Sequence, residues 1–143
     1  MSKYSHGFTL VEVATAIVII SILVTVGSIS FWAVQRDSRD STREVRVTIL
    51  AEALEKYYEA HGEYPACADL TAPAATVASG TLKGIDPEIL KAPNGSTNSI
   101  VCTAPSAGQD AYYYDEGDDQ LSWTLQYMVE AKNDHKTIHS RRT

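Results

Sequence analysis

The chain has 143 residues and a formal net charge of −6, from 12 lysines and arginines against 18 aspartates and glutamates. This length allows one domain together with one hydrophobic segment. With 44% apolar and 21% charged residues the chain is not disordered by composition, and its acidic balance gives the bulk surface no general affinity for nucleic acid.

An uninterrupted run of apolar, small and hydroxyl residues extends from Val13 to Val34. As a helix rising about 1.5 Å per residue the run would cover about 33 Å, enough to cross a hydrocarbon core of about 30 Å. Phe31 and Trp32 lie near its far end, where aromatic side chains favour the membrane interface. A secretory signal cut near Ser30, a permanent single-span anchor, and a helix that starts in a membrane and ends in a protein assembly are three interpretations of this run.

The helix is expected to continue through residues 36–61. Residues 36–44 are polar on all sides, which favours a solvated stretch; the alternative is contact with neighbouring subunits. From Val47 the pattern is amphipathic, so one face is expected to pack on a sheet. Gly62 and Pro65 predict the end of the helix at about His61. The face is formed by Val47, Leu50, Leu54, Tyr57 and Tyr58.

The remaining residues, 62–143, predict a connector and a small antiparallel sheet, which makes the fold class α+β. Residues 66–97 are loop-rich, with a short helix from Asp86 to about Lys91 whose first residues are typical of a cap. Three strands are expected, the last with strict alternation of apolar and polar residues. The strand candidates are 99–103, 111–115 and 121–129, and the tail from Lys132 to Thr143 is expected to be solvated.

Cys67 and Cys102 lie outside the apolar run. If their part of the chain is extracytoplasmic they can pair, closing a loop of roughly 35 residues worth about 3–4 kcal/mol in the chain-entropy model; otherwise they are two buried thiols. The acidic loop 115–119 is interpreted as a solvated turn rather than a calcium site, because it does not match EF-hand spacing. No phosphate loop, nucleophile elbow or zinc-protease motif occurs. We therefore expect a non-enzyme without cofactor or metal.

The string GFTLVE at residues 7–12, followed by the apolar run, resembles the processing motif of type IV pilins and the related pseudopilins. A second string, LEKYYEAHGEYP at residues 54–65, resembles the end of the long first helix in that family. The chain departs from the family at His6, where a basic residue is common, and lacks the proline often found near the position of Ile29. Gly27 and Ser28 could still loosen the helix there.

The resemblance implies four segments: a cleaved leader (1–7), a transmembrane or fibre-core helix (8–35), its amphipathic continuation (36–61) and a globular part (62–143). It implies cleavage between Gly7 and Phe8 by a prepilin peptidase, which also methylates Phe8. Glu12 would then meet the new α-amine of a neighbouring subunit during assembly. The alternative for Glu12 is that its side chain simply reaches the headgroups.

The resemblance also implies a homopolymer, a helical filament built by an inner-membrane assembly platform from subunits first held in the lipid of the cytoplasmic membrane. A cell-surface pilus for adhesion, motility or DNA uptake is the preferred function, with nucleic acid a minor possible partner. A pseudopilin of a type II secretion or competence system is the alternative within the family. An anchored monomer and a secreted soluble protein are the alternatives outside it.

Overall fold

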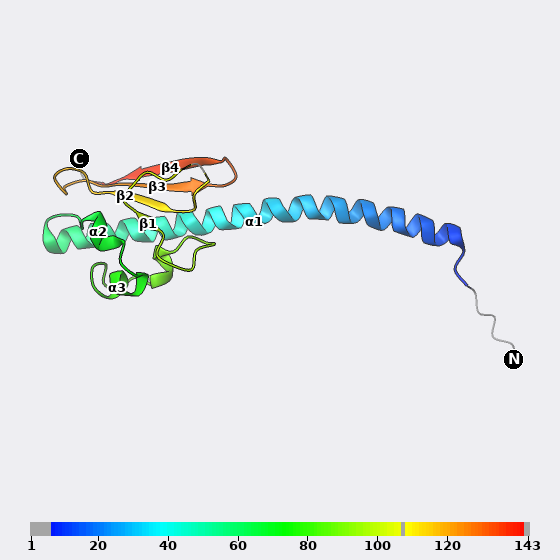
Figure 1. Cartoon of the computed structure of the whole chain (residues 1–143), viewed down its shortest axis with the longest axis horizontal. Helices are drawn as coiled ribbons and strands as arrows, with labels where there is room; N and C mark the ends of the chain where they lie inside the picture. Colours follow the sequence, from blue (N-terminus) through cyan, green and yellow to red (C-terminus); the bar gives the residue numbers. More distant parts are fainter. Residues whose placement is uncertain (1–6, 107, 142–143) are drawn as a thin grey trace. The chain divides into compact units, whose positions relative to one another are not determined.

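The computed structural model describes residues 7–106 and 108–141, and the expected leader residues 1–6 lie outside that part of the chain. The chain divides into two units, one ending at Gln35 and the other beginning at Arg36. Figure 1 shows the order of the elements along the chain. They are α1 (Leu10–His61), α2 (Cys67–Leu70), α3 (Ala74–Ser79), the 3-10 helix η1 (Pro87–Leu90), β1 (Ile100–Val101), β2 (Tyr112–Asp115), β3 (Thr124–Val129) and β4 (Asp134–His139).

Helix α1 contributes residues to both units, and its amphipathic stretch forms one side of the core of the second unit. Val47, Leu50 and Leu54 are buried, and Tyr57 and Tyr58 pack at the edge of the same cluster. The predicted apolar face of the helix is therefore confirmed. Residues of the sheet complete the core from the other side, chiefly Tyr112, Tyr114, Leu125 and Tyr127.

Helix α1 ends where the glycine pattern predicts. Gly62 has φ of +80°, a left-handed conformation that side chains disfavour, and its N–H donates to the Tyr58 carbonyl at 2.8 Å. After it, the connector is more ordered than the expected loop, because it contains α2, α3 and η1. The predicted cap is present at η1, where the Asp86 carboxylate accepts from the Glu88 N–H at 2.9 Å.

The sheet has the order β1-β2-β3-β4 and is mixed rather than wholly antiparallel as expected. Strand β1 pairs with β2 in parallel, with Ile100 opposite Tyr112, whereas β2–β3 and β3–β4 are antiparallel. The parallel pair arises because the chain leaves the sheet after Val101, where Cys102 bonds to Cys67. The following loop then returns the chain to the same end of the sheet before β2 begins, as a parallel pair requires.

The described part of the C-terminal tail is largely exposed, as its composition predicts, but it is ordered, because residues 134–139 form β4 against β3. The turn between them uses Asn133 in a left-handed conformation, at φ of +49°. Lys136 reaches Glu44 on α1 at 2.6 Å, and Ile138 packs at the edge of the core. The sequence DHKTIH carries polar residues on both faces, so it lacks the alternation by which a half-buried strand is found.

The polar stretch 36–44 is likewise not solvated throughout, because Arg43 is only 1% exposed. Its guanidinium donates to Asp40 at 2.8 Å, to Asp110 at 2.9 Å and to Glu130. Arg39 donates from Nε to Glu130 at 2.9 Å. The solvated interpretation is wrong for these residues, because partners more than 60 positions away in sequence neutralise them.

Asp40 completes this ionic cluster by holding the β3–β4 turn. Its two carboxylate oxygens accept from the backbone N–H groups of Glu130 and Ala131, at 2.8 and 2.9 Å. The hydrogen bonds from Arg39, with those from Arg43, lower the pKa of Glu130 to about 2. We define the ionic cluster as Arg39, Asp40, Arg43, Asp110 and Glu130; it ties α1, the segment before β2 and the β3–β4 turn together.

Candidate processing and assembly site

The first turn of α1 carries a capping box formed by Thr9 and Glu12. The Thr9 N–H donates to the Glu12 carboxylate at 2.9 Å, and the Thr9 hydroxyl donates to the same oxygen at 2.8 Å. In return, the Glu12 N–H donates to the Thr9 hydroxyl oxygen at 3.2 Å. This reciprocal arrangement satisfies N–H groups that a helix start leaves without partners, and it places a negative charge where the helix dipole favours one.

The capping box holds the Glu12 carboxylate against Thr9, the residue that follows Phe8 in the chain. Phe8 is 88% exposed, and Gly7 is exposed as well. Both residues precede the first helical residue, Leu10, so their peptide bond lies ahead of the helix and outside regular secondary structure. Sequence reasoning assigned a role to Glu12 but missed its hydrogen bond with Thr9, although the T-x-x-E spacing is a known sign of a capping box.

Among the described residues of its own unit, the apolar part of α1 that follows has no packing partner. Its large apolar side chains are exposed, among them Val13, Ile17, Ile22, Leu23 and Trp32. An 18-residue window of the helix has a mean hydropathy of 2.5 and is not buried anywhere. By length and composition the helix can cross a membrane. A monomeric soluble protein rarely exposes an apolar surface of this kind, so the surface is an interaction site.

Hydroxyl groups in the apolar segment are satisfied inside the helix. Each donates to the carbonyl oxygen four residues earlier, at 2.7 to 3.3 Å. Such bonds let serine and threonine enter an apolar environment without an unpaired donor. The residues are Thr15, Ser21, Thr25, Ser28 and Ser30. Gly27 and Ser28 lie inside the continuous helix, so no break is present there in this structure.

A family model described as the prokaryotic N-terminal methylation motif matches residues 2–28. The chain carries the type IV prepilin signature. The prepilin motif covers the exposed Gly7–Phe8 peptide, the capping box and most of the apolar helix. Comparison with curated proteins and with solved structures gave no match to this chain. The motif is characteristic of structural pilin-type and pseudopilin-type subunits, which are generally not enzymes.

The unit from Arg36 onward contains the other residues singled out in the sequence. Cys67 and Cys102 form a disulfide that closes a sequence separation of 35 residues around α2, α3, η1 and β1. The acidic loop 115–119 is not simply solvated, because Glu116 accepts from the Cys67 N–H at 3.1 Å. Within the described residues, no three His, Cys, Asp or Glu side chains gather into a group that could hold a metal ion.

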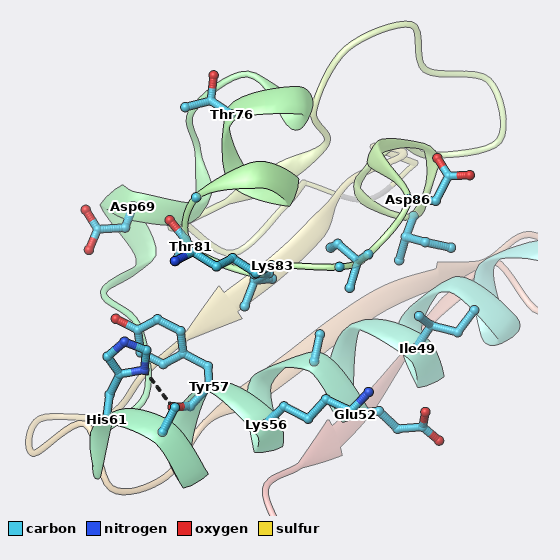
Figure 2. A pocket seen from close by; sticks show the side chains of 17 residues that line it. Ile49, Glu52, Lys56, Tyr57, His61, Asp69, Thr76, Thr81, Lys83 and Asp86 are labelled. Atoms are coloured by element: carbon cyan, nitrogen blue, oxygen red, sulfur yellow. Dashed lines mark hydrogen bonds between the residues drawn. The ribbon is translucent and has the colours of Figure 1, made fainter.

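A groove of about 720 Å³ runs in the same unit between α1 and the loop 80–86. Figure 2 shows Tyr57 and His61 at one end of it and Lys83 above the helix. The two rings stack with centroids 4.0 Å apart, and His61 Nδ1 donates to the Tyr57 carbonyl at 2.9 Å. Charges of both signs line the groove, and they form no pattern that selects one ligand.

Proposed function

We propose that the chain is the precursor of a type IV pilin, a structural subunit that is cut between Gly7 and Phe8 and methylated on Phe8. The observation that carries the proposal is the prepilin motif joined to an apolar helix with no partner in its own unit. A prepilin peptidase that also methylates would act on the exposed Gly7–Phe8 peptide. The product would polymerise with itself through residues 8–35 into a helical filament.

Before assembly the subunit would lie in the cytoplasmic membrane as a single-pass protein, with the unit from Arg36 onward outside the cytoplasm. The disulfide supports this placement, because disulfides persist in oxidising compartments. An assembly platform in the same membrane would then move the subunit into a cell-surface pilus. Apolar contacts with lipid would be exchanged for contacts between helices, and the outer unit would serve adhesion, motility or DNA uptake.

Glu12 would act at the transfer from membrane to filament. Cleavage creates an α-amine on Phe8, and a carboxylate in hydrocarbon costs about 2.5–3.5 kcal/mol on insertion scales. Pairing Glu12 of one subunit with the Phe8 amine of another would remove both uncompensated charges and fix the axial register of the helices. A Glu12→Ala variant should therefore be processed normally but yield few filaments, with Glu12→Asp as the matched control that retains the charge.

The first test is the intact mass and N-terminal residue of the protein from its native cell, in membrane and sheared-surface fractions. A chain beginning at methylated Phe8 in the sheared fraction would establish a pilin. Methylated Phe8 found only in membranes would favour the alternative, a pseudopilin of a type II secretion or competence system. An unprocessed chain, or one beginning near Phe31, would refute processing at Gly7 and Phe8.

A further inference from the structure

The loop between η1 and β1 carries the tripeptide Asn94-Gly95-Ser96, which the proposed function does not use. Asparagine, then any residue except proline, then serine or threonine is the acceptor sequence for sugar transfer to a side-chain amide. The other asparagines of the chain, Asn98 and Asn133, have neither serine nor threonine two positions later. The sequence therefore offers one acceptor of this kind, and the fold decides whether an enzyme can reach it.

All three residues of the tripeptide are exposed, and they lie at a turn. The Gly95 N–H donates to the Ala92 carbonyl at 2.8 Å, which closes a β-turn with Pro93 and Asn94 at its two central positions. Loops on the surface of a rigid unit are the parts of a protein most open to a second protein. The acceptor amide is therefore presented where a transferase can reach it.

The polar side chains around the turn differ in whether the fold uses them. Asn98 donates from Nδ2 to two backbone carbonyls ahead of α3, both at 2.6 Å, and the Ser99 hydroxyl oxygen accepts a backbone N–H at 2.8 Å. The side chains of Asn94 and Ser96, in contrast, form no hydrogen bond with any other described residue. The two side chains that sugar transfer requires are thus the ones that the fold leaves available.

An asparagine followed by glycine can also lose its amide spontaneously, and the turn opposes this competing reaction. In deamidation the backbone nitrogen of Gly95 attacks the side-chain carbonyl carbon of Asn94 and expels ammonia. Here the Gly95 N–H is already donated to the Ala92 carbonyl, and the site is packed so closely that an added Cβ would lie 2.9 Å from the Ser99 hydroxyl oxygen. The turn must therefore open before this attack, whereas the amide nitrogen is accessible as it stands.

The disulfide supports the compartment in which such a modification takes place. The tripeptide lies within the segment that the Cys67–Cys102 bond closes. Disulfides persist in oxidising compartments, and acceptor asparagines of this kind are used in surface loops of secreted proteins. The covalent bond and the tripeptide therefore point to the same side of the membrane.

We propose that Asn94 is a glycosylation site whose substrate is an oligosaccharide carried on a polyprenyl diphosphate lipid. In the transfer, Nδ2 of Asn94 forms a bond to the anomeric carbon of the first sugar and gives up one proton. The bond between that carbon and the diphosphate oxygen breaks, and the lipid diphosphate leaves with the electron pair. The proposal rests on the extracytoplasmic placement of the unit from Arg36 onward in the proposed function.

The test is the mass of one tryptic peptide of the full chain purified from its native cell, after reduction and alkylation. Between Lys91 and Lys132 the sequence has no lysine or arginine, so trypsin releases residues 92–132 as one peptide. We expect its mass to exceed the mass of the sequence by whole sugar residues, with fragment ions that place the increment on Asn94. Asn94→Gln and Ser96→Ala should abolish the increment, whereas Ser96→Thr, which keeps the hydroxyl, should retain it. The matched control is Thr97→Ala, an exposed neighbour outside the tripeptide, which should also retain it.

An unmodified Asn94, or only the small mass gain of deamidation, would overturn the proposal. So would an increment that survives Asn94→Gln but disappears in Ser96→Ala, because the sugar would then be bound to the serine oxygen. A chain that begins at methylated Phe8 and is unmodified at Asn94 would refute the glycosylation and leave the proposed function intact. An unprocessed chain that carries sugar on Asn94 would do the reverse.

Discussion

Replacing Arg43 with methionine should destabilise the unit from Arg36 onward more than any other single change in the ionic cluster. Arg43 is 1% exposed and is bonded to three carboxylates, those of Asp40, Asp110 and Glu130. Methionine leaves those carboxylates close together without their shared cation. Breaking a buried ion pair from one side typically costs about 3–5 kcal/mol, because the remaining charge is left uncompensated.

The matched control is Arg39→Met. Arg39 is 25% exposed and bridges Glu130 alone, which would still have Arg43 as a partner. A partly exposed pair of this kind contributes about 1 kcal/mol or less. Because a domain of about 100 residues loses roughly 4 °C of Tm per kcal/mol, the two variants should differ by about 8 °C or more.

The assay is urea and thermal unfolding of the full chain in detergent, followed by the fluorescence of the buried Trp123 with the Trp32 contribution removed by the Trp32→Phe background. Equal losses for Arg43→Met and Arg39→Met would refute the reasoning, because they would mean that burial of Arg43 adds nothing to the pairing. A stabilised Arg43→Met would refute it more directly.

Four further predictions concern other parts of the chain. The pKa of Glu130 is lowered to about 2, below the ordinary value of about 4.3. The stability that ionised Glu130 adds should therefore be complete above a pH of about 4.3 and be lost as the pH falls toward 2. In a Glu130→Gln variant the free energy of unfolding should depend less on pH within that window, as measured by urea titration at each pH. Gly62→Ala should cost about 1 kcal/mol because φ is +80° with open space around the position, whereas Gly27→Ala, in ordinary helix, should not destabilise the outer unit. Thr9→Val should raise amide exchange in the first turn of α1 about fivefold by removing a cap worth about 1 kcal/mol, with Thr9→Ser unchanged; equal exchange in both would contradict the capping box. Reduction of the Cys67–Cys102 disulfide should lower the unfolding free energy by about 3–4 kcal/mol, as followed by urea titration with and without reductant.

Much of this fold is predictable from local patterns, and the failures have a common cause. The apolar run, the amphipathic face from Val47 and the glycine at position 62 act within a few residues, so they can be recognised in the sequence. The burial of Arg43 depends on Asp110 and Glu130, which are 67 and 87 positions away. Strand β4 depends on pairing with β3 and on a turn held by Asp40, and its own sequence has no apolar face.

In the candidate site, too, the features set by neighbouring residues could be predicted and those set by distant residues could not. Gly7, Phe8 and Glu12 could be singled out from the sequence, because the motif that contains them is one short stretch of chain; their roles in processing and assembly are proposals. The hydrogen bonds from Thr9 to Glu12 could also have been predicted from the sequence, since both residues belong to one helical turn. The parallel pairing of β1 and β2 could not be predicted, because it depends on how the connecting loop returns the chain to the sheet, and no feature of β1 itself indicates the direction of its neighbour.

The glutamate at the head of the apolar helix can be understood as a charge with two successive sets of partners. In the single chain, the Thr9 N–H and hydroxyl hold the carboxylate at the helix start, where the dipole also favours it. In the proposed membrane-held state the carboxylate would keep these hydrogen bonds at the start of the span. Moving the subunit outward by a few turns would carry Glu12 into hydrocarbon, where Thr9 alone cannot neutralise it. At that point the Phe8 amine of a neighbouring subunit would be the available counter-charge. In the proposed assembly, the residue that opposes extraction of a lone chain would therefore favour its addition to a filament.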